Sequence, residues 1–348
     1  MQLTIQDIAF GGKGVGRSEG LAVFVPFTIP GETVEVEFTR RKKKYAEADL
    51  VAVVTPSPDR VKPVCRYFGR CGGCSYQHLA YPAQLEVKAR QVEQTLRRVG
   101  KLAEVPMRPI IASPSPYGYR NRIRVHVVQG VTGFYSVGAN ALIDIEECPI
   151  ASAEVNGRLT ELRSRYLPDG DYTVAERRNH GFFEQTNDEV AREMLKVVEE
   201  LVTPGGRLVD AYCGAGFFSR HLRGRYEEVI GIEENEFAVA HARSVAIPGE
   251  RYLAGDVALH LPDILAEGGA ASQTTLILDP PAIGASARVL DAIVASAPRE
   301  VIYVSCNPAT LARDLEILGR SFTLASVTPL DMFPQTAEIE VVAHLKRL

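Results

Sequence analysis

The chain has 348 residues, of which 46% are hydrophobic and 24% charged, an ordinary globular composition that is long enough for two or three domains. No apolar stretch approaches the roughly 20 residues that cross a membrane. The first residues, MQLTIQDIAFGG, lack the basic and apolar regions of a signal peptide. We therefore expect a cytoplasmic protein without a membrane partner, whose six cysteines are thiols, metal ligands or catalysts rather than disulfides.

The formal net charge of −4 conceals a basic region. Between Pro56 and Val125 there are 13 Lys and Arg against 4 Asp and Glu, and a second basic cluster, RRKKK, begins at Arg40. Basic patches confined to one half of a chain indicate a polyanionic partner such as nucleic acid. For either cluster alone, a solvated charged surface is an equally good interpretation.

Residues 1–56 predict a small β domain. The stretches LTIQDIAF, LAVFVPF, ETVEVEFT and YAEADLVAVV alternate apolar and polar residues, and GGKGVGRSEG and IPGE between them are typical of turns. Short strands with Gly-rich turns in about 55 residues predict a barrel of the OB type.

Residues 57–180 predict a small α+β domain that follows a Pro-rich linker, TPSPDRVKP. A helix is predicted over residues 82–100, because its apolar residues recur at spacings of three and four, and it can pack on the C-terminal domain. Short strands follow from about residue 107 to residue 178.

Four cysteines of this region form a candidate metal site. Cys65, Cys71 and Cys74 have the spacing Cys-x5-Cys-x2-Cys, and Cys148 lies far downstream. The Cys-Gly-Gly-Cys sequence lets two sulfurs turn toward one centre. The spacing alone allows zinc or an iron–sulfur cluster.

Residues 181–348 predict an open, Rossmann-like α/β sheet. Apolar strands such as RLVDAYCGAG, EVIGIEEN, TLILDPP and EVIYVSC end in small, acidic or Cys residues and alternate with helices. In such sheets the ligands bind beyond the carboxyl ends of the strands, so the residues at these ends are the candidate site.

A nucleoside cofactor is indicated at the first two strand ends. Asp210 precedes a loop that contains Gly214 and Gly216, and Glu233 lies 23 residues after Asp210, where an acid can bind ribose hydroxyls. A dinucleotide dehydrogenase has similar spacing. S-adenosylmethionine is favoured because Ser219 breaks the G-x-G-x-x-G pattern and because Asp210 suits a cationic ligand.

The remaining strand ends also carry reactive side chains. Asp256 is a candidate partner of an adenine amino group or, alternatively, a helix N-cap. Asp279 is followed by two prolines, which stiffen its loop. Cys306, in VSCNPATLARDL, is a candidate nucleophile or a packing residue, and Glu340 lies near the C-terminus.

Several motifs together carry a family resemblance. They are F-x-Q-x-N at 183–187, D-x-Y-C-G-x-G at 210–216, DPP at 279–281, VSCNPATLARDL around Cys306, and DMFPQTAEIE, which leads to Glu340. Over nearly its whole length the chain resembles the S-adenosylmethionine-dependent 5-methyluridine methyltransferases of tRNA and 23S rRNA. GGKGVGR and FVPFTIPGETVEVE resemble the TRAM domain, an RNA-binding barrel.

The resemblance implies an enzyme that methylates C5 of a uridine in structured RNA through a covalent cysteine adduct. It makes Cys306 the nucleophile, Glu340 the general base and Asp279 a group that holds the uracil edge or orients the nucleophile's loop. The loop DPPAIGA has no cysteine, which favours uracil over cytosine. The residues expected around the cofactor are Gln185, Tyr212, Gly214, Glu233, Asp256 and Asp279.

Some members of the resembled family hold a [4Fe–4S] cluster on the pattern of Cys65, Cys71, Cys74 and Cys148, so we expect this cluster, with zinc as the alternative. Cys213 is expected to be a packing residue. Glu338 ranks second to Glu340 as the base.

The sequence departs from the family pattern at Ala282, where Arg is usual, at Glu338, where His is common, and at Phe217, where a polar residue is frequent. Two other classes compete. One is a non-catalytic RNA-binding protein with the same fold. The other is an iron–sulfur radical enzyme, although that class needs a Cys-x3-Cys-x2-Cys motif. We expect a monomer, and tRNA and 23S rRNA are both candidate substrates.

Overall fold

A computed structural model describes residues 1–138, 141–177, 181–267 and 272–348. The chain forms two compact units, each assembled from separate stretches. The first unit contains Met1–Gln91, Pro114–Arg177 and Phe333–Glu338, and the second contains Val92–Ser113, Arg178–Met332 and Ile339–Leu348. The domain boundary predicted at residue 180 lies outside the described residues. The predicted fold class, a mixed α/β chain with an N-terminal barrel and a Rossmann-like sheet, is confirmed.

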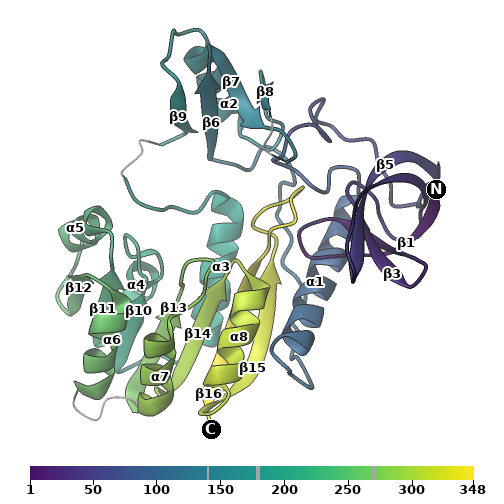
Figure 1. The fold of residues 1–348 in the computed structure, drawn as a ribbon. Coiled ribbons are helices and arrows are strands. Elements are labelled where there is room, and N and C mark those ends of the chain that lie inside the picture. Colours follow the sequence, from purple (N-terminus) through teal and green to yellow (C-terminus); the bar gives the residue numbers. More distant parts are fainter. Residues whose placement is uncertain (139–140, 178–180, 268–271) are drawn as a thin grey trace. The chain divides into compact units, whose positions relative to one another are not determined.

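The N-terminal strands close into a five-stranded barrel in the order β1-β2-β3-β5-β4 (Figure 1). Alternate residues of each strand point inward, and a core that includes Ile5, Val23 and Val34 fills the barrel. The basic residues of the β4–β5 turn, residues 40–44, are all exposed. The strands are β1 (Gln2–Ile8), β2 (Gly14–Ser18), β3 (Leu21–Val25), β4 (Thr33–Arg41) and β5 (Tyr45–Thr55).

The first unit also contains a four-stranded antiparallel sheet in the order β8-β7-β6-β9. Helix α2 (Ala153–Arg163) covers one face, where Val155 and Leu159 share a core with Ile123 and Val125. The strands are β6 (Arg122–Val128), β7 (Val131–Tyr135), β8 (Leu142–Asp144) and β9 (Gly170–Ala175).

The second unit is built on a seven-stranded sheet in the order β12-β11-β10-β13-β14-β16-β15. The first five strands are parallel, and β16 and β15 are antiparallel to their neighbours. The strands are β10 (Arg207–Ala211), β11 (Glu228–Glu233), β12 (Glu250–Ala254), β13 (Thr274–Leu278), β14 (Glu300–Ser305), β15 (Phe322–Leu330) and β16 (Glu340–Arg347).

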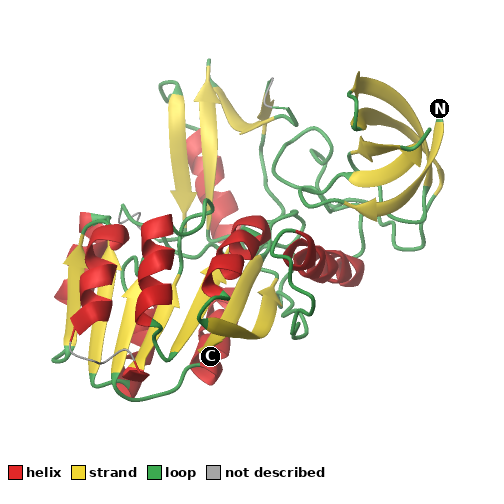
Figure 2. Ribbon diagram, turned by 60° about the horizontal axis from the view of Figure 1, so that its bottom comes forward, coloured by secondary structure: helices red, strands yellow, loops and turns green. Residues whose placement is uncertain are grey.

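Helices cover both faces of this sheet (Figure 2). Every residue of β13 and β14 is buried, as expected of parallel strands that are covered on both sides. The helices are α3 (Asp188–Leu201), α4 (Phe217–Leu222), η1 (Arg223–Arg225), α5 (Glu236–Ser244), α6 (Val257–Ala266), α7 (Ala287–Ser296) and α8 (Pro308–Leu318).

Helix α1 (Tyr81–Arg98) contributes to both units. Its later residues Val92 and Leu96 are buried in the core of the second unit, together with residues of β10, β13 and β14. None of the helices in the described part of the chain combines the length and the apolar character that a membrane crossing requires.

Candidate active site and thiol cluster

The predicted site residues of the second unit gather at one edge of its sheet. The carboxyl ends of the parallel strands β10 to β14 lie at this edge. Strand β16 runs in the opposite direction and therefore begins at the same edge. Tyr212 follows β10, Glu233 ends β11, Asp256 lies just beyond β12, Asp279 follows β13, Cys306 follows β14 and Glu340 begins β16.

Cys306 and Glu340 are neighbours across two strands. In the β14–β16 pair Ser305 lies opposite Val341, so the next positions outward are Cys306 and Glu340. Cys306 is exposed, whereas only 5% of Glu340 is exposed. An accessible cysteine and a sheltered glutamate therefore occupy adjacent backbone positions at this edge of the sheet.

Glu338 has a different environment from Glu340. It precedes β16 rather than lying in it, and its side chain is largely exposed. Its carboxylate is 4.0 Å from the guanidinium of Arg120, within the first unit. Glu338 therefore lies outside the strand that Glu340 begins.

The thiol of Cys306 is carried at the beginning of helix α8. Asn307 caps this helix, because its side-chain oxygen accepts the N–H of Ala309 at 3.0 Å. The hydroxyl of Ser305 accepts the N–H of Asn307 and donates to its carbonyl, both at 3.1 Å. These bonds fix the backbone on both sides of Cys306.

Three residues of the loop after β10, one of them not a glycine, have positive φ values. Tyr212 has φ 66°, Gly214 φ 54° and Gly216 φ 86°. The carboxylate of Glu233 accepts the N–H of Gly214 at 3.0 Å and that of Asn235 at 2.8 Å. Glu233 thus connects the ends of β10 and β11, where a cofactor ribose is expected.

Three carboxyl groups crowd the ends of β10, β11 and β13. Asp210 is fully buried, and burial together with the charge of Glu233 raises its pKa to about 7. Burial and the charges of Asp210 and Glu233 raise the pKa of Asp279 to about 8. One oxygen of Asp210 accepts the N–H of Ser219 at 2.9 Å. A cation bound here would favour the charged forms of these carboxyl groups.

The remaining cofactor candidates are Asp256, Tyr212 and Gln185. Asp256 caps helix α6 through a 2.8 Å bond from the N–H of Ala258, so its N-cap role is confirmed. Burial, followed by the charges of Asp256 and Asp314, raises the pKa of Tyr212 to about 12. Gln185 is partly buried in the segment before α3.

Two motif residues have structural roles. Cys213 is 4% exposed and packs with Val239 and Tyr252, as predicted. Asn187, the last residue of the F-x-Q-x-N motif, is fully buried and caps α3, and its amide donates to the hydroxyl of Ser113 at 3.1 Å.

Sequence analysis did not single out Asp314 or Arg313. Asp314 is fully buried and accepts a 2.6 Å bond from the Tyr303 hydroxyl. A signal was present, because Asp314 lies three residues after Leu311 and one before Leu315, on the apolar stripe of its helix. A charged residue on such a stripe requires a buried partner.

The four cysteines of the first unit line one cavity of about 210 Å³. Burial, with a smaller contribution from the neighbouring cysteines, raises the pKa of Cys71, that of Cys74 to about 12 and that of Cys148 to about 11. These three thiols are therefore neutral at pH 7 unless a cation binds them. Cys65, the fourth member, accepts the N–H of Tyr67 on its sulfur at 3.4 Å.

Two arginines, Arg120 and Arg124, are also among the residues that line this cavity, and the buried Nε of Arg120 has no hydrogen-bond acceptor among the described residues. Within those same residues, no three His, Cys, Asp or Glu side chains are grouped so that they could hold a metal ion.

Comparison with known proteins gives two family matches. Residues 1–51 match the TRAM domain, and residues 268–348 match the family described as tRNA (Uracil-5-)-methyltransferase. An RNA methyltransferase of Bdellovibrio bacteriovorus is 32% identical, and the alignment covers 99% of this chain and 95% of the relative. A second one, from Thermosynechococcus vestitus, is 30% identical, with 99% and 97% covered. The chain belongs to the family of these RNA methyltransferases.

A solved structure supports the assignment over the full length. The Pyrococcus abyssi tRNA (uracil-54, C5)-methyltransferase, in complex with S-adenosyl-L-homocysteine, matches with a TM-score of 0.74 and 26% identity, covering 99% of this chain and 100% of that one. This methyltransferase is therefore an S-adenosylmethionine-dependent enzyme that acts on RNA, with an N-terminal TRAM barrel.

Proposed function

We propose that the enzyme transfers the methyl group of S-adenosylmethionine to C5 of one uridine in a structured tRNA or 23S rRNA. The products are 5-methyluridine and S-adenosylhomocysteine. The observation that carries the proposal is the strand register that puts the exposed Cys306 and the buried Glu340 at adjacent positions of one sheet edge. The Pyrococcus abyssi relative acts on uracil 54 of tRNA, which supports tRNA as a substrate class.

The chemistry requires a nucleophile and a base on one ring. The thiolate of Cys306 forms a bond to C6, and the electrons of the C5–C6 double bond move onto the C4 carbonyl oxygen. C5 then carries the electron density that accepts the methyl group, which the sulfonium cofactor supplies. Glu340 removes the proton from C5, the double bond forms again, and the thiolate leaves. Glu340 is suited to this because it is sheltered from water.

The other strand-end residues bind and orient the reactants. We assign to Asp279 the uracil edge or the orientation of the nucleophile's loop. The acidic end of the sheet formed by Asp210, Glu233 and Asp279 attracts the sulfonium cation of the cofactor. The target base is unstacked from the RNA to enter the site, so a loop or bulge is the expected target.

Trapping with 5-fluorouridine RNA tests the roles of Cys306 and Glu340. Fluorine at C5 leaves no proton to remove, so the enzyme is expected to remain covalently attached through Cys306. Cys306→Ala should abolish the adduct. Intact methylation by that variant would refute the nucleophile and favour a non-catalytic role for this thiol.

Glu340→Gln tests the base separately. With ordinary RNA this variant is expected to form the methylated adduct and release it slowly. Glu338→Gln is the matched control, because it makes the same change two residues away at an exposed position. Normal turnover by Glu340→Gln, with loss of turnover in Glu338→Gln, would move the base to Glu338.

We further propose that Cys65, Cys71, Cys74 and Cys148 hold a [4Fe–4S] cluster, with zinc as the alternative. The cavity that all four cysteines line, together with the unpaired Nε of Arg120 among its lining residues, supports this proposal. A cluster would tie the linker to the small sheet, with no redox step in methyl transfer. Anaerobically purified protein should absorb near 400 nm and contain iron; a colourless protein with stoichiometric zinc would contradict this.

We also propose that the enzyme is a cytoplasmic monomer. Size-exclusion chromatography with light scattering tests the oligomeric state. Mass-spectrometric mapping of 5-methyluridine in RNA from a deletion strain identifies the target, since only the substrate position loses its modification.

A further inference from the structure

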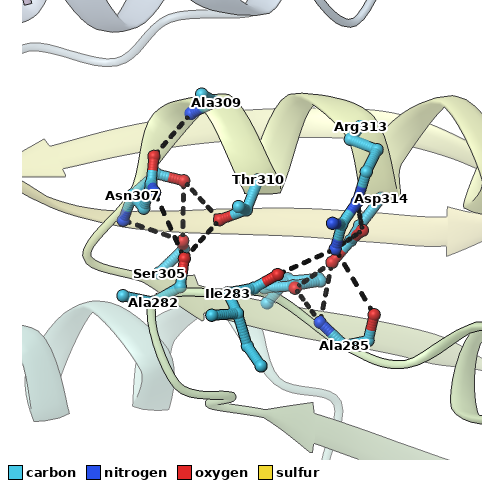
Figure 3. A network of polar contacts seen from close by, with 10 residues as sticks. Ala282, Ile283, Ala285, Ser305, Asn307, Ala309, Thr310, Arg313 and Asp314 are labelled. Atoms are coloured by element: carbon cyan, nitrogen blue, oxygen red, sulfur yellow. Dashed lines mark hydrogen bonds and ion pairs between the residues drawn. The ribbon is translucent and has the colours of Figure 1, made fainter.

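The loop after Asp279 is fastened to the first turn of the helix that begins beside Cys306. The carbonyl oxygen of Ala282 accepts two hydrogen bonds from that helix (Figure 3). The Asn307 amide donates one at 3.2 Å, and the Thr310 hydroxyl donates the other at 3.1 Å. The loop and the beginning of α8 therefore cannot shift independently without breaking these bonds.

A second attachment lies one helical turn further along α8. The Arg313 guanidinium donates to the carbonyls of Ile283 at 3.0 Å and Ala285 at 3.4 Å. Asp314 accepts the N–H of Ala285 at 2.9 Å and is also paired with Arg313 at 2.7 Å (Figure 3). A carboxylate with no exposed surface keeps its charge at low cost only when its oxygens are paired in this way.

Gly284 shows how closely the loop approaches the pair. Its φ is 81°, and a Cβ atom added there would lie 2.5 Å from the Arg313 Nη2 and 2.6 Å from the Asp314 Oδ2. Its N–H closes a turn onto the carbonyl of Pro281 at 2.8 Å. The turn and the pair therefore fit each other only when position 284 has no side chain.

The buried carboxylate also faces the nucleophile's strand and the cofactor loop. Its Oδ2 accepts the hydroxyl of Tyr303, which lies in β14, three residues before Cys306. The charge of Asp314 contributes to the raised pKa of Tyr212. Asp314 is thus the meeting point of α8, β14 and the Asp279 loop.

We propose that Arg313 and Asp314 are positioning residues that hold the Asp279 loop and the Cys306 helix as one rigid body for attack on C6. This inference rests on the proposed function. The pair touches neither substrate nor reacting atoms, and it acts through the backbone of residues 282–285. Because reacting groups must meet within a fraction of an ångström, loosening this body should slow adduct formation rather than weaken cofactor binding.

The experiment measures two quantities in the full-length enzyme: the rate of covalent adduct formation on 5-fluorouridine-containing tRNA and 23S rRNA transcripts at saturating cofactor, and the affinity for S-adenosylmethionine. Asp314→Asn removes the charge, Arg313→Gln removes the guanidinium, and Gly284→Ala disturbs the fit from the loop side. Asp291→Asn, an exposed position on α7, is the matched control.

Each of the three variants is expected to form the adduct about tenfold to hundredfold more slowly, with cofactor affinity within about twofold of wild type. Asp291→Asn should match wild type. Arg313→Lys, which keeps the charge and one donor, should recover part of the lost rate. Wild-type rates in Arg313→Gln and Asp314→Asn would overturn the proposal. A parallel loss of cofactor affinity would also overturn it, because that indicates general collapse of the site.

Two further outcomes are decisive. If Asp314→Asn fails to fold, Arg313→Gln decides, because about half of the Arg313 side chain is exposed and Asp314 keeps its bonds from Ala285 and Tyr303. If wild type forms no adduct on either RNA, the proposed function fails and this inference fails with it. Wild-type trapping with unaffected variants refutes the positioning role alone.

Discussion

The buried carboxyl group of Asp210 makes the stability of the cofactor-free enzyme depend on pH in an unusual direction. Its pKa of about 7 in the folded protein is well above the value of 3.8 for an unperturbed aspartate. Between these values the folded state binds more protons than the unfolded state. The free energy of unfolding therefore falls as pH rises from about 4 to 7 and then levels off.

The size of the effect follows from the shift. Each pKa unit corresponds to about 1.4 kcal/mol, so ionised Asp210 costs about 4 kcal/mol above pH 7. Asp210→Asn removes this cost and can keep the bond from Ser219, which an amide oxygen also accepts. The new amide N–H₂ is buried where one carboxylate oxygen has no partner, at a cost of about 1–3 kcal/mol.

The variant is thus expected to be about 1–3 kcal/mol more stable than wild type at pH 8 and no more stable at pH 5. Loss of the Asp210 charge also lowers the pKa of Asp279, which adds to the gain at high pH. Urea unfolding of cofactor-free protein at pH 5, 6, 7 and 8, followed by circular dichroism, measures the difference. Asp291→Asn is the control for an exposed site. A difference between Asp210→Asn and wild type that is the same at every pH would refute the reasoning.

Three other outcomes are expected. His78 is 1% exposed and lies against the rings of Phe27 and Phe68. Burial and a neighbouring guanidinium lower its pKa to about 4, so the free energy of unfolding should fall as pH drops from 6.5 toward 4. His78→Phe should flatten this loss in thermal unfolding scans. Gly133→Ala should destabilise the small sheet by about 1–3 kcal/mol or more, because the new Cβ would lie 1.8 Å from the Ile143 carbonyl oxygen; urea unfolding that matches wild type would contradict this. Calorimetry should show S-adenosylmethionine affinity rising from pH 6 to 8 more than that of S-adenosylhomocysteine, since only the former carries the sulfonium charge that the three strand-end carboxylates attract; equal pH dependences would contradict their role.

The sequence by itself determined the sheet edge that carries the chemistry. Apolar runs that end in Glu233, Asp279 or Cys306 can be read as parallel strands, and parallel strands bring their carboxyl ends to the same edge. Alternation of apolar and polar residues likewise predicted the barrel. These features depend on local periodicity and on short motifs, which a single sequence displays directly.

Only the tertiary structure decided how the edge is completed. Strand β16 returns antiparallel between β14 and β15, and this pairing brings the first residue of β16, Glu340, to the edge where β14 ends before Cys306 and leaves Glu338 outside the strand. It also supplied the distant partners of Asp314, which are Ala285 in the loop, 29 residues away, and Tyr303 in β14, 11 residues away. Strand order, register and buried ion pairs depend on contacts between distant segments. Local sequence patterns specify which side chains need partners, and the packing of the whole chain selects those partners.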